Sequence, residues 1–337
     1  MKINMDKWAG DIIEDEKVKN LPILFFPCLP TINKGVIEVI NNAEAHYENM
    51  KNVIAEFPAM IGAMTGMDLT SEAETFGCGV SFSDTEAPHI TGEIVFDRAS
   101  AESLQVPSVN DGRGPVFVKA AGLAAQNITD RPTFGGMLGP YSLAGVLMGI
   151  ERALKATIKD GQTVHIVLEK CTCYLIAYAK AFKEAGANGI LIAEPTAGLL
   201  PPKHCDEFSS KYVKEIVDAV QDEGFFVVLH NCGNTKKLVD SMVSTGAKGY
   251  HFGNAVQMVD VISQIPPKYL VFGNIDPARV LNEGTEELIK ETTKDLLEKM
   301  KPYKHFVLSS GCDLPMEVPI ANLKSFFVAL EEFNNGE

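Results

Sequence analysis

The chain has 337 residues, 46% of them hydrophobic, and its formal net charge at pH 7 is −14, from 44 acidic and 30 basic side chains. This length allows a large buried core, and we expect one domain over residues 1–337. The acidic balance argues against nucleic acid as a partner, because phosphate backbones are bound by clustered lysines and arginines. No run approaches the roughly 18 apolar residues that a membrane span needs. The seven cysteines, an odd number spread thinly, indicate a reducing cytoplasm rather than a disulfide framework.

The first 20 residues are rich in charged residues and helix formers, and they predict a helical extension ahead of the main fold. Eight apolar runs that follow are typical of buried strands. These runs cover residues 22–27, 64–69, 133–138, 189–194, 225–230, 248–252, 269–273 and 305–309. From the third run onward a helical pattern follows each strand, as in residues 202–223 and 286–300. Apolar strands that alternate with helices predict a parallel sheet covered on both faces.

The number of strand–helix units predicts the architecture. Eight units favour a closed (β/α)₈ TIM barrel, and an open doubly wound sheet is the alternative. Residues 71–130, between the second and third predicted strands, are too many for one barrel helix and predict a long insertion. Polar loop signals within residues 81–84 and 110–114 support that interpretation.

Three candidate metal ligands follow two of the predicted strands. His230 ends the fifth strand, Cys232 lies two residues later, and Cys312 follows the eighth strand. Barrel strands place their carboxyl ends on one rim, where active sites are built, so these side chains should converge. Imidazole and thiolate suit zinc, and three protein ligands are typical of a catalytic site with an open position. The alternative is that these three residues bind no metal, since free cysteines are often simply buried. Cys171 and Cys173, in a predicted helix, are expected in the core.

Five stretches of the sequence carry a resemblance to a known family. They are DLTSEAE at residues 68–74 with Gly77 and Cys78, GPYSLA at 139–144, HNCGNT at 230–235, FGNIDP at 272–277, and Gly311 with Cys312. With them the chain resembles the uroporphyrinogen decarboxylase superfamily, most closely its methylcobalamin:coenzyme M methyltransferase branch. The resemblance implies the barrel fold and a zinc site at His230, Cys232 and Cys312.

The resemblance also implies the chemistry. Zinc would bind a small thiol and deprotonate it, and the thiolate would take a methyl group from methylcobalamin or another corrinoid carried by a partner protein. A small methylated compound is the other substrate class. Residues 250–254 lack the carboxylate that some relatives in this branch place after the sixth strand, so the fourth ligand is expected to be water, a carboxylate from elsewhere or His251. Further candidates for substrate binding or catalysis are Asp68, Glu72, Glu194, Asn234 and Asp276. Asp276 precedes a proline and is equally typical of a helix N-cap.

Two other functions remain open at this point. The shared barrel motifs and Asp68 also fit a uroporphyrinogen decarboxylase, but residues 21–30 lack the arginine with which decarboxylases hold their polyanionic substrate. A non-catalytic adaptor that binds a corrinoid and is stabilised by zinc is the second alternative. Only five arginines are present, and none lies at a predicted strand end. We therefore expect either that the insertion folds an arginine over the barrel mouth, or that the thiol is not coenzyme M.

Overall fold

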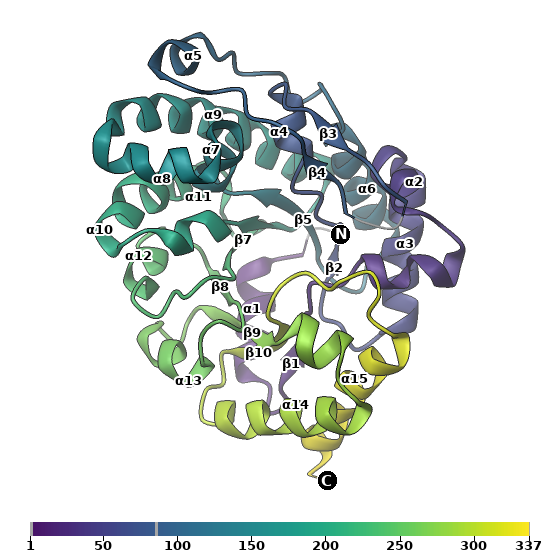
Figure 1. Cartoon of the computed structure of the whole chain (residues 1–337). Coiled ribbons are helices and arrows are strands. Elements are labelled where there is room, and N and C mark those ends of the chain that lie inside the picture. The colour runs from purple at the N-terminus through teal and green to yellow at the C-terminus, as the bar shows by residue number, and fades with distance from the viewer. Residues whose placement is uncertain (1–2, 85–86, 337) are drawn as a thin grey trace.

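The protein is described by a computed structural model that covers residues 3–84 and 87–336. Eight parallel strands form one sheet in the order β1-β10-β9-β8-β7-β6-β5-β2, and helices surround it (Figure 1). The strands are β1 Lys19–Asn20, β2 Ala63–Met64, β5 Thr133–Leu138, β6 Gly189–Ala193, β7 Phe226–Asn231, β8 Gly249–Phe252, β9 Leu270–Ile275 and β10 Phe306–Ser310. A bridge from Asn20 to Met60 and a 3.1 Å hydrogen bond from the Ile61 amide to the Asn20 carbonyl join the edge strands. The sheet therefore closes, and the predicted TIM-barrel class is confirmed.

The six predicted strands from residue 133 onward agree with the structure to within two residues at each end. The first two predictions are wrong in position. The chain pairs with β10 at Lys19–Asn20, ahead of the predicted run at residues 22–27, and the last two residues of that run begin a 3₁₀ helix, η1, over Phe26–Ile32. Pro27 has no amide hydrogen to give to a sheet, which favours this outcome. The second strand is only Ala63–Met64, and the chain turns at Asp68, whose carboxylate accepts the Thr70 amide at 3.0 Å.

The surrounding helices pack their apolar sides onto the barrel. They are α2 Val36–Asn41, α3 Ala43–Glu56, α6 Gly114–Asn127, α7 Pro140–Met148, α8 Ile150–Lys159, α9 Gly161–Ala185, α10 Pro202–Cys205, α11 Lys211–Val220, α12 Val239–Val243, α13 Met258–Val261, α14 Glu286–Met300 and α15 Ile320–Asn335. Short helical turns η2 Pro195–Leu199, η3 Asp206–Ser210, η4 Ile262–Gln264 and η5 Pro277–Asn282 connect some of them. The predicted helix at residues 286–300 coincides with α14, which begins where the Thr285 hydroxyl accepts the Leu288 amide. Among the described residues no helix is long and apolar enough to cross a bilayer.

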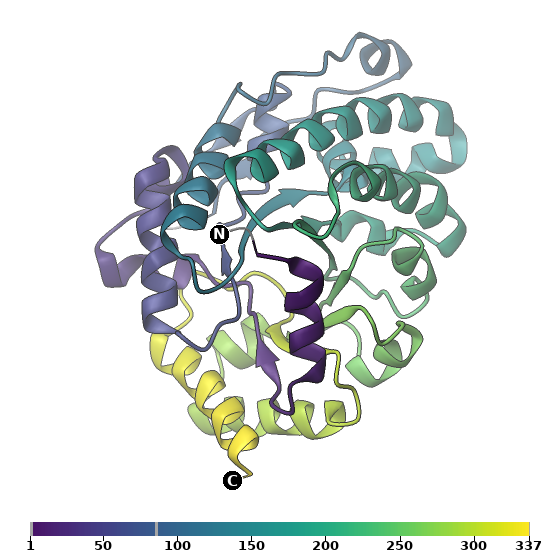
Figure 2. The ribbon, with the colours of Figure 1, turned by 180° about the vertical axis from the view of Figure 1, so that it is seen from behind.

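Helix α1, Met5–Glu14, is the predicted helical extension, and it covers the amino-terminal end of the barrel (Figure 2). Its Trp8 ring packs against Phe134 of β5 and Phe226 of β7, with centroid distances of 5.8 and 5.6 Å. Both phenylalanines lie near the amino ends of their strands. The first two residues of the expected extension, like residue 337 of the expected domain, lie outside the described residues. Helix α1 therefore covers the end of the barrel opposite to the rim at the carboxyl ends of the strands.

The predicted insertion contains one barrel helix and a separate excursion. Helix α6, its last helical segment, packs against β5 as a barrel helix does. The excursion before it holds α4 Ser71–Thr75, the antiparallel hairpin β3 Val80–Ser81 and β4 His89–Ile90, and α5 Arg98–Ser103. Lys170 of α9 donates to the Ala101 and Glu102 carbonyls, both at 2.7 Å, and so fastens α5 to the barrel. Residues 85 and 86 of the expected insertion lie outside the described part of the chain.

Helix α9 also carries the two cysteines that were expected in the core. Cys171 is fully buried, as predicted, but Cys173 is exposed, so that part of the prediction is wrong. Residues two apart on a helix point to different sides, and only one of them can face the core.

Candidate metal centre

Three side chains with metal-binding atoms meet at the carboxyl-end rim. His230 is the penultimate residue of β7, Cys232 follows that strand, and Cys312 lies two residues beyond β10. Their ligand atoms all lie within 4.8 Å of one another, and Cys312 Sγ is 3.7 Å from His230 Nε2. Among the described residues this is the only group of three or more such side chains. The predicted trio is therefore brought together, although 82 residues separate His230 from Cys312.

The two cysteines influence each other's ionisation. Hydrogen bonding with Cys312 lowers the pKa of Cys232. The same contact with a negatively charged sulfur raises the pKa of Cys312. A divalent cation between the two sulfurs would remove this difference between their pKa values, since it stabilises both thiolates at once. One imidazole and two thiolates form a donor set that fits zinc.

Glycines allow the rim loops to pack tightly around the trio. A Cβ atom on Gly253, just after β8, would lie 2.8 Å from the Cys232 carbonyl oxygen and closer still to its Cα. A Cβ atom on Gly311 would lie 2.8 Å from the amide nitrogen of Asn254. Any side chain at residue 253 must therefore displace the Cys232 backbone. This packing gives a physical reason why residues 250–254 supply no carboxylate ligand from that position.

His251, the candidate fourth ligand, lies behind His230. The register of β7 and β8 pairs the two residues, and their Nδ1 atoms are 2.8 Å apart. The other ring nitrogen of His251 is 2.9 Å from the hydroxyl of Ser309. Burial, and then the neighbouring His230, lower the pKa of His251 well below its usual range. Both of its ring nitrogens are thus engaged away from the two sulfurs, so the structure does not place His251 as a ligand.

Two other candidates support the loops. Glu194, at the end of β6, is buried and accepts the amides of Tyr141 and Ser142 at 2.8 Å, at the start of α7. Burial raises its pKa, but three donors, including the Ser209 hydroxyl at 2.9 Å, surround the carboxylate. The structure therefore gives Glu194 the role of fixing the start of α7.

Asp276 follows β9 and serves as the N-cap of η5, as one of the two sequence interpretations proposed. One carboxylate oxygen accepts the amides of Ala278 and Arg279, both at 2.9 Å. The other accepts the side-chain amide of Asn254 at 2.8 Å, beside Gly311. Asp276 thus orders the rim next to the trio.

Asn234, another candidate, is exposed in the loop after Cys232.

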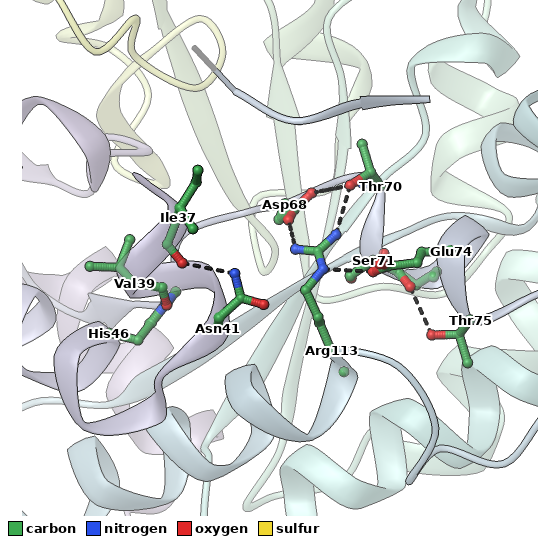
Figure 3. Close-up of polar contacts among 12 residues, drawn as sticks. Ile37, Val39, Asn41, His46, Asp68, Thr70, Ser71, Glu74, Thr75 and Arg113 are labelled. Atoms are coloured by element: carbon green, nitrogen blue, oxygen red, sulfur yellow. Dashed lines mark hydrogen bonds and ion pairs between the residues drawn. The ribbon is translucent and has the colours of Figure 1, made fainter. Parts of the chain in front are cut away.

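On the β2 side of the rim, a second cluster binds the insertion to the barrel (Figure 3). Arg113, directly before α6, forms a buried ion pair with Asp68. Its Nε donates to Glu74 at 2.6 Å and another guanidinium nitrogen to the Thr70 hydroxyl at 2.9 Å. The sequence singled out Asp68 but not its partner, because nothing local indicates where an insertion arginine will fold.

Glu72 lies in the same region and is almost completely buried. Its carboxylate accepts the Leu138 amide at the end of β5 and the Ser71 hydroxyl, both at 2.8 Å. Burial raises the pKa of Glu72 to about 7. Asp68, Glu72 and Glu74 are thus brought together around the start of the insertion, whereas Glu194, Asn234 and Asp276 belong to other parts of the rim.

Comparisons with known proteins agree with this architecture. The family model "Uroporphyrinogen decarboxylase (URO-D)" matches residues 18–333. The methylcobamide:CoM methyltransferase MtbA of Methanosarcina acetivorans is 29% identical over 321 residues, covering 93% of both chains. The protein of the same name from Methanosarcina mazei is 30% identical over 322 residues, covering 91% of this chain and 93% of the other.

The solved structures add a likeness of fold. A methyltransferase from Methanosarcina mazei matches with a TM-score of 0.87 at 24% identity, covering 97% of this chain and 98% of that one. The resemblance drawn from the sequence motifs is confirmed, including its closer similarity to the methyltransferases. This chain belongs to the uroporphyrinogen decarboxylase family.

Proposed function

We propose that the protein is a zinc-dependent corrinoid methyltransferase that moves a methyl group between a methylated corrinoid protein and a small thiol. The observation that carries the proposal is the convergence of His230, Cys232 and Cys312 within 4.8 Å at the barrel rim. The similarity to methylcobamide:CoM methyltransferases supports the same class of enzyme.

The chain's own residues supply the ligands and their arrangement. His230 offers a neutral nitrogen, and the two cysteines offer thiolates whose charges together balance a divalent ion. A zinc ion held there would deprotonate a thiol that takes its fourth position. The sulfur of that thiolate would attack the methyl carbon presented by the corrinoid partner; the C–S bond would form as the methyl–cobalt bond breaks, with its electron pair left on cobalt. The role of the loops after β7, β8 and β10 would be to hold the sulfur in line with the methyl carbon.

The charge arrangement at the rim bears on which thiol is used. The insertion brings one arginine, Arg113, to the buried carboxylate of Asp68, in the loop beyond β2. Its charge is already balanced by Asp68 and Glu74, so it is a poor partner for a sulfonate. We therefore propose a thiol other than coenzyme M. Methyl exchange with coenzyme M, homocysteine and neutral thiols in competition tests this choice, and a clear preference for coenzyme M would contradict it.

Metal analysis combined with a methyl-exchange assay tests the function itself. Purified protein should hold one zinc per chain and transfer a methyl group from methylcobalamin to a thiol. Cys312→Ser should lose both the zinc and the transfer, because it removes one of three protein ligands. Cys173→Ser, an exposed cysteine on α9, is the matched control and should retain both. Methyl transfer at the wild-type rate by zinc-free Cys312→Ser protein would refute the proposal.

A further inference from the structure

The hydrogen bonds behind His230 form a chain that ends at a backbone carbonyl. His230 Nδ1 is 2.8 Å from His251 Nδ1, and His251 Nε2 is 2.9 Å from Ser309 Oγ. The Ser309 hydroxyl lies 2.7 Å from the carbonyl oxygen of Leu21, just after β1. All four residues are at most 3% exposed. The chain thus links β7, β8, β10 and the segment after β1 through buried groups.

The direction of each hydrogen bond follows from the end of the chain. A carbonyl oxygen can only accept, so the single hydroxyl hydrogen of Ser309 points to Leu21. Toward His251 the Ser309 oxygen can then only accept, and the proton of the His251 ring must be on Nε2. No other placement of the protons forms both the Ser309–Leu21 and the Ser309–His251 hydrogen bonds.

The position of the proton on the His230 ring follows from that on His251. His251 is buried between two polar neighbours, and a neutral imidazole carries one proton. With that proton on Nε2, its Nδ1 holds a lone pair and must accept from His230. His230 therefore carries a proton on Nδ1, so in the neutral ring that a metal ligand requires, the lone pair is on Nε2, the atom that lies 3.7 Å from Cys312 Sγ.

We infer that His251 and Ser309 are positioning residues that hold His230 in the tautomer whose Nε2 lone pair faces the two cysteines. The inference rests on the proposed function in one respect, which is that zinc is the ion bound there. Metal-binding histidines usually donate their second N–H to a carboxylate, a carbonyl or water. Here the acceptor is a neutral imidazole, so the chain orients the ligand without adding negative charge beside two thiolates.

The tautomers can be measured directly in the metal-free wild-type protein. Long-range ¹H–¹⁵N correlation spectra of protein labelled at histidine nitrogens should show His230 protonated on Nδ1 and His251 protonated on Nε2. Signals are assigned from their loss in His230→Gln and His251→Phe. A His230 ring protonated on Nε2 and not on Nδ1 would overturn the inference.

Zinc affinity, measured by competition with a chromophoric chelator, tests the consequence. His251→Phe keeps a ring beside Phe272 but removes the acceptor, and should weaken zinc binding by about 10 to 100-fold. His251→Asn restores an acceptor oxygen near the place of Nδ1 and should recover most of that loss. Zinc binding by His251→Phe equal to that of the wild type would contradict the inference.

The chain also offers a matched pair on β10. Ser309→Ala breaks the chain and should weaken zinc binding. Ser310→Ala removes a buried hydroxyl that accepts the Ile23 amide at 3.1 Å but touches neither histidine, and should leave zinc binding unchanged. Equal losses in both variants would show a general packing effect and overturn the inference. None of these measurements involves methyl transfer, so a failed methyl-exchange assay would count against the proposed function while leaving the tautomer result intact.

Discussion

The two sides of the barrel rim satisfy their polar groups in different ways. Around β7, β8 and β10, a chain of buried hydrogen-bonding groups lies behind His230, whose ring nitrogen and the two nearby sulfurs lie within 4.8 Å of one another. Around β2 and β5, the single positive charge of Arg113 is paired with two carboxylates, those of Asp68 and Glu74, in a compact ion cluster. The first arrangement has ligand atoms left for a cation, whereas the second has no unpaired positive charge to offer an anion. We therefore assign the chemistry to the side around β7, β8 and β10, and attachment of the insertion to the side around β2 and β5.

Arg113→Met should have the largest effect on stability, since it leaves the buried carboxylate of Asp68 and the half-buried one of Glu74 without their partner. We expect the free energy of unfolding to fall by about 3–5 kcal/mol in urea denaturation. Zinc affinity should remain that of the wild type, because the cluster belongs to the other side of the rim. Arg98→Met, which breaks an exposed pair with Glu102, is the control and should change stability little. A loss of zinc affinity in Arg113→Met would show that the two sides act as one unit.

Glu72→Gln should change how stability depends on pH. Burial raises the pKa of Glu72 from 4.5 to about 7, so between these values the folded chain holds a proton that the unfolded chain has released. The resulting stabilisation is fully present below pH 4.5 and is lost as the pH rises to about 7, a change of about 3 kcal/mol.

Glu72→Gln lacks this pH-dependent contribution, so its free energy of unfolding should fall less steeply than that of the wild type as the pH rises over the same range. Asp313, whose pKa burial also raises to about 7, contributes equally in both proteins and cancels in the difference. Urea denaturation of both proteins from pH 5 to pH 8 gives the two slopes. Parallel slopes would mean that Glu72 is ionised in the folded protein throughout.

Gly253→Ala should have the smallest effect, confined to the metal side. The new methyl group must displace the Cys232 backbone, and we expect zinc affinity to drop about 10-fold, equivalent to about 1.4 kcal/mol. Gly10→Ala in α1, where a Cβ atom meets nothing within 4 Å, is the control and should bind zinc as the wild type does. Unchanged affinity in Gly253→Ala would mean that the loops after β7 and β8 are not packed as tightly as the structure shows.

The sequence predicted the two halves of the barrel unequally, for a physical reason. Strands β5 to β10 are continuous apolar runs buried on both faces, and such runs are visible in a sequence. Strands β1 and β2 pair over only two residues each, so no run marks them. The apolar run at residues 22–27, predicted as the first strand, ends in Pro27 and leads into η1.

The candidate site shows the same limit. His230, Cys232 and Cys312 could be identified because each follows a predicted strand, and a barrel places such residues on one rim. The contacts of Arg113 depend on the path of the insertion, and the need for glycine at residue 253 depends on how two loops approach. His251 could be placed beside His230 only through the register of β7 and β8.

Zinc K-edge X-ray absorption with and without a thiol substrate tests the central claim most directly. We predict that zinc in the resting protein has two sulfur neighbours and one histidine nitrogen, and that addition of the thiol raises the number of sulfur neighbours to three. This change would show thiol activation at the site formed by His230, Cys232 and Cys312. A resting zinc already closed by four protein ligands, and unaltered by any thiol that supports methyl exchange, would contradict the account.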